Sequence, residues 1–159
     1  MTPRNIWRLI IALILCHGAG IMGVLFTNQQ STWYNLLKKP SFTPPSWIFG
    51  PVWSILYTCM AVALYIIWNV GFDSPEGRYA LIAFGIQLAA NTVWSFLFFK
   101  FHLIFVALLD CIVLFVAIII TMNAFAQIEP VAAYFLIPYF VWVGFACVLN
   151  MGLWLLNKK

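Results

Sequence analysis

Charged residues are scarce in this chain of 159 amino acids. Lys and Arg number eight and Asp and Glu four, so 8% of the residues are charged, whereas 65% are apolar. Soluble domains are about 25% charged and about 45–50% apolar. A water-soluble fold of this length would leave too much apolar surface exposed to water. The composition therefore excludes an ordinary soluble domain and predicts that most of the surrounding solvent is lipid.

The sequence also lacks the patterns that bind metals or nucleic acids. Its net charge of +4 is too thinly spread for a phosphate-binding patch, so no nucleic-acid partner is expected. The cysteines lie singly inside apolar runs, with no C-x-x-C pair and no histidine at metal-ligand spacing: Cys16, Cys59, Cys111 and Cys147. We expect free thiols that pack as small apolar side chains, and no metal site.

Long apolar runs dominate what remains. A bilayer core of about 30 Å is crossed by a helix of about 20 apolar residues. The runs predict an all-α integral membrane protein, a single transmembrane domain over residues 1–159, with five helices at residues 6–26, 47–70, 79–99, 103–125 and 131–156. The one long connection, residues 27–46, contains lysines and prolines and is predicted to be a loop between the first two helices.

The basic residues predict an orientation in the membrane. Five spans place the following residues on the side of the long loop and the C-terminus: Lys38, Lys39, Lys100, Lys158 and Lys159. Arg4, Arg8 and Arg78 share the other side. The positive-inside rule then favours a cytoplasmic long loop and C-terminus. No small-residue cleavage site follows the first run, so we expect it to stay as a helix in a plasma or inner membrane.

Three of the predicted helices carry polar or aromatic side chains on one face. The stripes are Trp53 and Tyr57 in the second helix, Gln87, Asn91 and Ser95 with Trp94 beside them in the third, and Trp142, Ala146 and Asn150 with Phe145 beside them in the fifth. All lie between the bilayer middle and the long-loop face, by a helical rise of about 1.5 Å per residue. Amides facing lipid would be left unpaired, so these faces should point inward. Converging, they would line an aromatic cavity for a flat apolar ligand with polar edges.

Several features of the helices have two interpretations. Gln87, Asn91 and Asn150 would also serve to hydrogen-bond one helix to another. His17 and Asp110 are ionisable groups inside predicted spans and hence functional candidates, although His17, beside several glycines, is favoured as a packing residue. Small residues four apart in the first helix predict close helix contact, either within the chain or in a homodimer. Two prolines inside the helices, Pro51 and Pro138, predict modest kinks.

The segment from Trp33 to Tyr57 (WYNLLKKPSFTPPSWIFGPVWSILY) is far more specific than composition. It resembles the translocator protein family, also called tryptophan-rich sensory proteins, TspO/MBR proteins or peripheral-type benzodiazepine receptors. Residues 87–95 (QLAANTVWS) and 138–150 (PYFVWVGFACVLN) are similar to that family's third and fifth helices. The resemblance covers essentially the whole chain.

This resemblance implies a five-helix bundle, often dimeric, with a cavity beneath the first loop. It implies binding of porphyrins such as protoporphyrin IX and of isoquinoline carboxamide or benzodiazepine ligands. Position by position, it implies pocket residues at Trp53, Tyr57, Asn91, Trp94, Trp142, Phe145 and Ala146, to which the stripe adds Gln87. It also implies a lid and hinge at Trp33, Pro44, Pro45 and Trp47. Residues 149–154 lack the tyrosine of the cholesterol-recognition pattern in animal members, so sterol binding is not expected there.

The favoured function is a receptor- or transporter-like membrane protein that binds tetrapyrroles. The ring would stack on Trp53 and Trp142, and its propionates would find Lys38 or Lys39 in the lid. The alternative is light- and oxygen-dependent breakdown of protoporphyrin IX, which the family resemblance also implies. No conventional catalytic constellation is recognisable, so that chemistry would come from the ligand with the two indoles as redox partners. A sensory or scaffolding partner is the third possibility, and no obligatory cofactor is expected.

Overall fold

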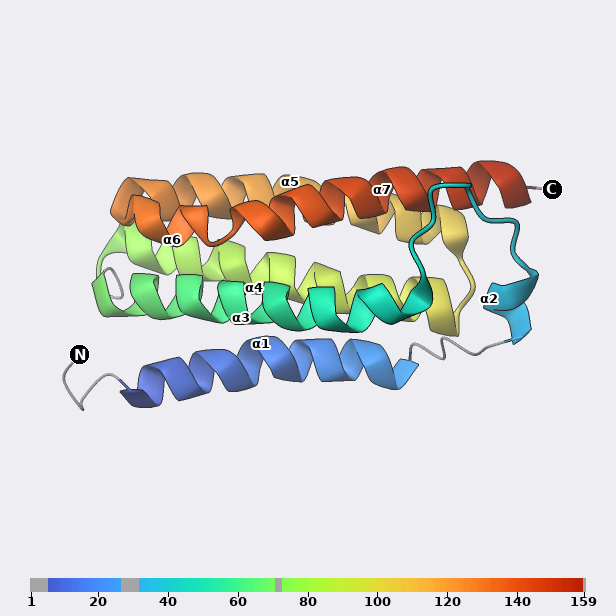
Figure 1. Ribbon diagram of the computed structural model, residues 1–159. Helices are drawn as coiled ribbons and strands as arrows, with labels where there is room; N and C mark the ends of the chain where they lie inside the picture. Colours follow the sequence, from blue (N-terminus) through green and yellow to red (C-terminus); the bar gives the residue numbers. More distant parts are fainter. Residues whose placement is uncertain (1–5, 27–31, 71–72, 159) are drawn as a thin grey trace.

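The structure, a computed structural model, describes residues 6–26, 32–70 and 73–158, and the regular elements over those residues are all helical. Five segments are long and apolar enough to cross a membrane. They are α1 (Ile6–Phe26), α3 (Ser46–Val70), α4 (Pro75–Ser95) continued by η2 (Phe96–Lys100), α5 (Ile104–Ile128), and the pair α6 (Pro130–Tyr134) and α7 (Ile137–Asn157) (Figure 1). The prediction of an all-α bundle with five membrane-spanning segments is confirmed.

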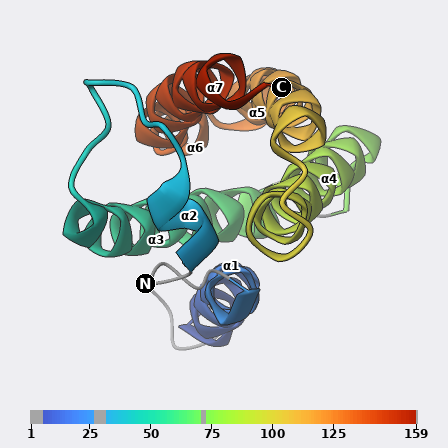
Figure 2. The ribbon, with the colours of Figure 1, turned by 90° about the vertical axis from the view of Figure 1, so that its right-hand side faces the viewer.

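The segments run side by side along one axis. Helices α3 and α4 lie between α1 on one side and α5 and α7 on the other (Figures 1 and 2). Helix α1 packs on α3 and α4, and α5 packs on α4 and α7. At the end away from the loop, the short α6 packs against α3 and α5 and closes the bundle. The other end carries α2 (Thr32–Leu36) and the C-terminal end of α7.

Apolar side chains cover the outside of the bundle as well as its core. Ile14, Ile82, Val113 and Val141, from four different helices, are each more than half exposed. The core in the half of the bundle that contains α6 has large side chains that are almost completely buried: Met60, Ile67, Phe84, Phe125 and Leu136. In water such an outer surface would be unfavourable, but in a bilayer it contacts acyl chains, while helices satisfy their own backbone groups. The molecule is therefore built for lipid as its solvent.

Helix α4 begins earlier than the apolar run predicted. The run starts at Tyr79, but Ser74 caps the helix, because its Oγ accepts a hydrogen bond of 2.9 Å from the Gly77 amide. Pro75 occupies the first turn, where a missing N–H costs nothing, and Glu76 lies near the positive end of the helix dipole. The polar first turn thus extends the helix beyond its apolar part.

The fifth predicted helix is two helices in the structure. Glu129 caps the N-terminus of α6, and the chain turns at Phe135 and Leu136 before α7 begins at Ile137. Pro138 lies in the first turn of α7, where its lack of an N–H is tolerated. The prediction of a modest kink at Pro138 inside one helix was therefore wrong, because the proline starts a new helix instead of bending an existing one.

The end of α4 widens into the π-helix η2. The Phe101 amide donates to the Phe96 carbonyl at 3.0 Å, five residues back. Each such turn holds one residue more than an α-turn and rotates the side chains that follow. His102, in the tight connection to α5, adopts a φ of 56° in the left-handed region. The widened turn directs Phe98 and Phe99 toward the interior at the loop end.

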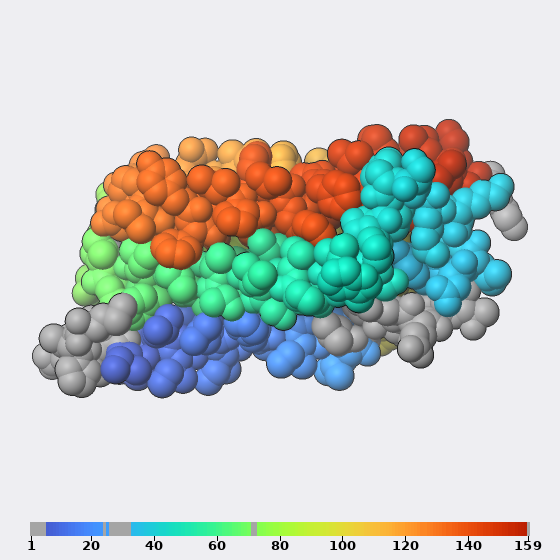
Figure 3. All heavy atoms as spheres, viewed as in Figure 1, coloured from blue at the N-terminus to red at the C-terminus, as the bar shows by residue number. Residues whose placement is uncertain are grey.

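The connection between α1 and α3 is a folded lid, defined here as residues 32–45. It was predicted as a continuous loop over residues 27–46, but residues 32–36 form α2; residues 27–31 lie outside the described part. Asn157 of α7 anchors the lid, since its Oδ1 accepts from the Lys38 amide at 3.0 Å and its Nδ2 donates to the Lys38 carbonyl at 2.8 Å. A Cβ at Gly152 would lie 2.6 Å from Pro40 Cγ, so only glycine permits this approach. Figure 3 shows the lid against the ends of α3 and α7.

Candidate ligand-binding site

Beneath the lid lies a cavity of about 340 Å³, lined by residues of α1, α2, α3, α4, η2, α5 and α7. Cavities that bind small molecules have volumes of roughly 300–1,000 Å³, are mostly apolar and contain a few polar groups. No Asp, Glu, Lys or Arg is among the described residues that line this one. The cavity therefore suits a ligand whose body is apolar.

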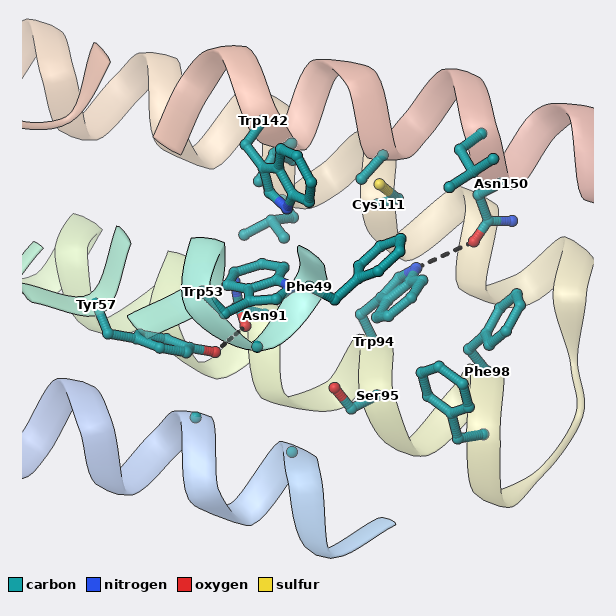
Figure 4. A pocket seen from close by; sticks show the side chains of 18 of the residues that line it. Phe49, Trp53, Tyr57, Asn91, Trp94, Ser95, Phe98, Cys111, Trp142 and Asn150 are labelled. Carbon is teal, nitrogen blue, oxygen red and sulfur yellow. Dashed lines mark hydrogen bonds between the residues drawn. The ribbon is translucent and has the colours of Figure 1, made fainter. Parts of the chain in front are cut away.

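Aromatic rings form much of the cavity wall (Figure 4). The ring of Trp53 stacks on that of Tyr57, with centroids 5.4 Å apart and planes at 29°. Trp142 of α7 meets Phe49 edge to face at 5.7 Å. Trp94 of α4 stacks on Phe98 at 5.1 Å. The two indoles at positions 53 and 142 thus border one shared cavity, on α3 and α7, and do not face outward to lipid.

A chain of hydrogen bonds crosses the cavity floor and joins three helices. The Tyr57 hydroxyl donates to Asn91 Oδ1 at 2.8 Å, and Asn91 Nδ2 donates to the Tyr139 hydroxyl at 2.8 Å. Asn91 and Tyr57 also line the cavity, whereas Tyr139 is fully buried beneath it. Asn91 therefore serves both interpretations of the amide stripe, because it ties helices together and borders the cavity.

A second amide fixes the orientation of an indole. Trp94 Nε1 donates to Asn150 Oδ1 at 3.1 Å, and Asn150 Nδ2 donates to the Ile104 carbonyl at 3.0 Å. Asn150 thereby joins α4, α5 and α7, and its bond to Trp94 is drawn in Figure 4. Both residues line the cavity, together with Ala146 one turn before Asn150 on α7. Because the Trp94 indole N–H already donates to Asn150, Trp94 can contact a ligand through the face of its ring.

Two residues predicted to contact a ligand lie elsewhere. Gln87 is 1% exposed, one turn deeper than Asn91, and its amide has no hydrogen-bond partner within the described residues. Phe145 packs against Trp142 at 5.6 Å and against Phe42 of the lid at 6.3 Å. Neither is part of the cavity lining. Gln87 is on the correct stripe but too deep, and Phe145 is turned toward the lid.

None of the predicted lid residues is among the described residues that line the cavity. Trp33 stacks on His102 with centroids 4.0 Å apart, and Trp47 is 74% exposed. The other predicted lid residues, Lys38, Lys39, Pro44 and Pro45, are likewise absent from the lining. The lid residue that lines the cavity is Tyr34, whose ring lies 4.5 Å from the Lys39 ammonium. Burial raises the pKa of the Tyr34 phenol, so it stays a neutral donor at physiological pH.

Helix α1 contributes a wall that the sequence did not reveal. His17, favoured as a packing residue, lines the cavity with Gly20, Ile21 and Gly23. A Cβ at Gly20 would clash with the Tyr57 ring, 2.8 Å from its Cδ2. Gly20 therefore serves close packing within the chain.

The cavity also contains groups that no stripe indicated. Cys111 of α5 lines it, and its sulfur lies 2.7 Å from that of Cys147 on α7, both as free thiols. Phe98, Phe99 and Leu114 complete the apolar wall. Asp110, a functional candidate by its position, does not line the cavity, and its buried Oδ2 has no hydrogen-bond partner in the described part of the chain.

The fold and the cavity define a class of protein. Five apolar membrane-spanning segments surround an aromatic cavity beneath a folded lid, as expected of a multi-pass integral membrane protein with an internal binding site. The profile of the TspO/MBR family matches residues 12–155. The chain belongs to the TspO/MBR family, as its Trp33–Tyr57 segment predicted.

Relatives from distant organisms resemble the chain over most of its length. The tryptophan-rich protein TspO of Chlorobaculum tepidum is 37% identical over 97% of this chain and 98% of the relative. The TspO protein of Archaeoglobus fulgidus is 38% identical over 96% and 99%. The human translocator protein is 37% identical over 77% and 73%. Family membership supports a receptor- or transporter-like role in the membrane.

Proposed function

We propose that this chain binds tetrapyrroles such as protoporphyrin IX in the cavity beneath the lid. The observation that carries the proposal is that Trp53, Trp94 and Trp142, from three different helices, border one cavity, and that its described lining residues include no Asp, Glu, Lys or Arg. Aromatic faces stack on a flat conjugated ring, and each such contact contributes about 0.5–1.5 kcal/mol beyond its buried area. The receptor- or transporter-like role of the family would then be exercised on this class of ligand.

The lid supplies charge where a porphyrin needs it. A porphyrin has an apolar ring and carboxylates at its edge, and the apolar cavity suits only the ring. The Lys39 ammonium is held over Tyr34, which itself lines the cavity, so it lies near a ligand's edge without lining the cavity. Lysine–carboxylate hydrogen bonds are charge-assisted and strong. We therefore assign the propionates to the lid, with Lys39 as their first partner.

Fluorescence titration tests the stacking pair. Protoporphyrin IX is titrated against the tryptophan emission of the purified protein and of the Trp53→Phe/Trp142→Phe double variant. Because two large stacking surfaces are reduced, affinity should fall by about tenfold. The matched control is Trp68→Phe/Trp154→Phe, two indoles outside the cavity lining, which should bind as the wild type does. Equal affinity in both double variants would refute this assignment.

Light-driven breakdown of the bound porphyrin is the second candidate, and the indoles at the cavity wall favour it. An excited porphyrin that takes one electron from Trp53 or Trp142 becomes a radical anion and leaves an indole radical cation. Dioxygen would add to a ring carbon of the radical anion, forming a carbon–oxygen bond as a ring double bond is lost, and cleavage of the resulting peroxide would open the ring. A thiol reductant in solution would return one electron to the indole. Illuminated and dark samples should then differ in porphyrin loss, and the double phenylalanine variant should lose its porphyrin more slowly in light. If free porphyrin in detergent bleaches equally fast, the protein is not the catalyst.

The proposal includes an assembly and a location. We propose a homodimer in an inner or plasma membrane, with the lid on the cytoplasmic side. The apolar outer faces of the helices can contact lipid or a second copy of the chain. The basic residues at the lid end support the cytoplasmic lid. Mass measurement of the protein in lipid nanodiscs tests the dimer. A single chain per disc at all protein-to-disc ratios would contradict it.

A further inference from the structure

His17 lines the cavity, and one of its ring nitrogens lacks a donor of good geometry within the described residues. It lies on α1 in the cavity lining, and its ring centroid is 6.2 Å from that of Tyr57. The sequence contains one other histidine, His102, which is exposed and stacks on Trp33 outside the lining. What His17 can bind depends on which of its ring nitrogens carries the hydrogen.

The hydrogen bond at Nδ1 assigns the tautomer. His17 Nδ1 lies 3.1 Å from the Leu13 carbonyl oxygen, one turn earlier on α1. A carbonyl oxygen can only accept, so Nδ1 carries the hydrogen, and Nε2 of the neutral ring keeps a lone pair.

The neighbour of Nε2 does not occupy that lone pair. Thr58 Oγ1 lies 3.5 Å from Nε2, at the limit of a hydrogen bond. The single Thr58 hydroxyl hydrogen is already donated to the Ser54 carbonyl at 2.8 Å. Two lone pairs therefore face each other across a long contact, and within the described residues Nε2 has no donor of good geometry.

This arrangement is the one that metal-binding histidines adopt. Such a histidine usually donates its other ring N–H to a backbone carbonyl or carboxylate, which fixes the ring and leaves one nitrogen for the metal. A single imidazole is the commonest protein ligand to a haem iron. We propose that His17 Nε2 is the axial ligand to the metal of a metallated tetrapyrrole, so that the cavity distinguishes haem-type ligands from metal-free porphyrins. The inference rests on the proposed function, because it needs the ring to enter the cavity.

Spectroscopy with two probes tests the ligand. Iron protoporphyrin IX and metal-free protoporphyrin IX are each added to the full-length protein in nanodiscs, as wild type, His17→Ala and His102→Ala. Loss of supporting groups around a metal-binding histidine costs about 10–100-fold in affinity, so loss of His17 itself should weaken iron porphyrin by at least about tenfold. The wild type and His102→Ala should show the iron–histidine stretching band of the ferrous form in resonance Raman spectra, and His17→Ala should lack it.

The metal-free probe separates the ways in which the inference can fail. His17→Ala should bind metal-free porphyrin as the wild type does, and added imidazole should restore the Raman band, which shows that the variant is folded. A band that persists in His17→Ala, or an equal loss of affinity for both probes, would overturn the axial-ligand assignment. Wild-type binding of metal-free porphyrin without any iron–histidine band would overturn this inference and leave the proposed function standing. Failure of the wild type to bind either probe would overturn the proposed function itself.

Discussion

At the scale of single residues, Asn91 best shows how a polar group is accommodated in a membrane bundle. Its amide bonds Tyr57 on one side and Tyr139 on the other, each at 2.8 Å, and it is 5% exposed. Unpaired amides are costly away from water, so the two phenols offset the burial of Asn91 and hold α3, α4 and α7 in register.

Replacement of Asn91 by leucine should destabilise the bundle. The change keeps the volume but leaves two buried phenol hydroxyls without their partner, so the free energy of unfolding should fall by about 1–3 kcal/mol. Thermal unfolding in detergent, followed by tryptophan fluorescence, measures the change. Thr92→Val is the matched control, since the Thr92 hydroxyl donates to the Leu88 carbonyl of its own helix and to no other helix within the described residues. An unchanged midpoint for Asn91→Leu would show that the network contributes nothing to stability.

At the scale of elements, the cavity depends on how closely α1 and the lid approach their neighbours. Gly20 lets α1 reach the Tyr57 ring, and Gly152 lets the lid reach α7 at Pro40. In both places a missing side chain makes room for a ring. These contacts close the cavity on the side of α1 and beneath the lid.

Two alanine substitutions on α1 should have opposite effects. Gly20→Ala puts a methyl group into the Tyr57 ring, and overpacking of this kind costs about 1–3 kcal/mol. It should lower both the unfolding midpoint and porphyrin affinity, because Tyr57 lines the cavity. Gly18→Ala meets no atom within 4 Å and should be neutral or stabilising by up to about 1 kcal/mol. Equal midpoints for the two variants would contradict the packing of α1 on α3.

The lid should open more readily without Asn157. Asn157→Ala removes both bonds to the Lys38 backbone, at about 0.5–1.5 kcal/mol each, so porphyrin release should become about tenfold faster. Stopped-flow fluorescence measures the rate. Asn123→Ala, an exposed amide on α5 away from the lid, is the control and should leave it unchanged. Identical release rates in the two variants would mean that the lid does not control exit.

At the scale of the whole molecule, the basic residues of the described part occur at the two ends of the bundle. Lys38, Lys39, Lys100 and Lys158 lie at the lid end, and Arg8 and Arg78 lie at the other. Between them the surface is apolar. The two ends of the bundle therefore differ in their number of basic residues, which is the difference that the positive-inside rule uses to predict orientation.

Single cysteines at the two ends should report the orientation. Ser41→Cys places an exposed thiol in the lid, and Asp73→Cys places one between α3 and α4. A membrane-impermeant maleimide added to intact cells should label Asp73→Cys, and Ser41→Cys only after lysis. The unsubstituted chain gives the background from its own four cysteines. Labelling of Ser41→Cys from outside would reverse the proposed orientation.

The predictions from sequence were strongest where a residue's own chemistry decides its place. Trp53, Tyr57, Asn91, Trp94, Trp142 and Ala146 were expected to share a cavity, and they do. Gln87 and Phe145, on or beside the same stripes, do not line it. A stripe predicts the side of the helix from which a side chain projects, but it does not predict how deep that side chain lies in the bundle or which residues it contacts. His17 was named as a functional candidate but favoured as a packing residue, because the sequence does not show which neighbours it faces; the structure places it in the cavity lining.

The sequence by itself determined the five spans, the inward faces and the family, since apolar length and the cost of an unpaired amide in lipid are properties of each segment alone. Only the tertiary structure decided which groups meet. The bonds of Asn91 to two phenols, the closure of the lid by Asn157 and the open nitrogen of His17 each involve residues that different helices bring together. Their distances depend on the rotation of each helix and on the added residue at η2, which no single segment encodes.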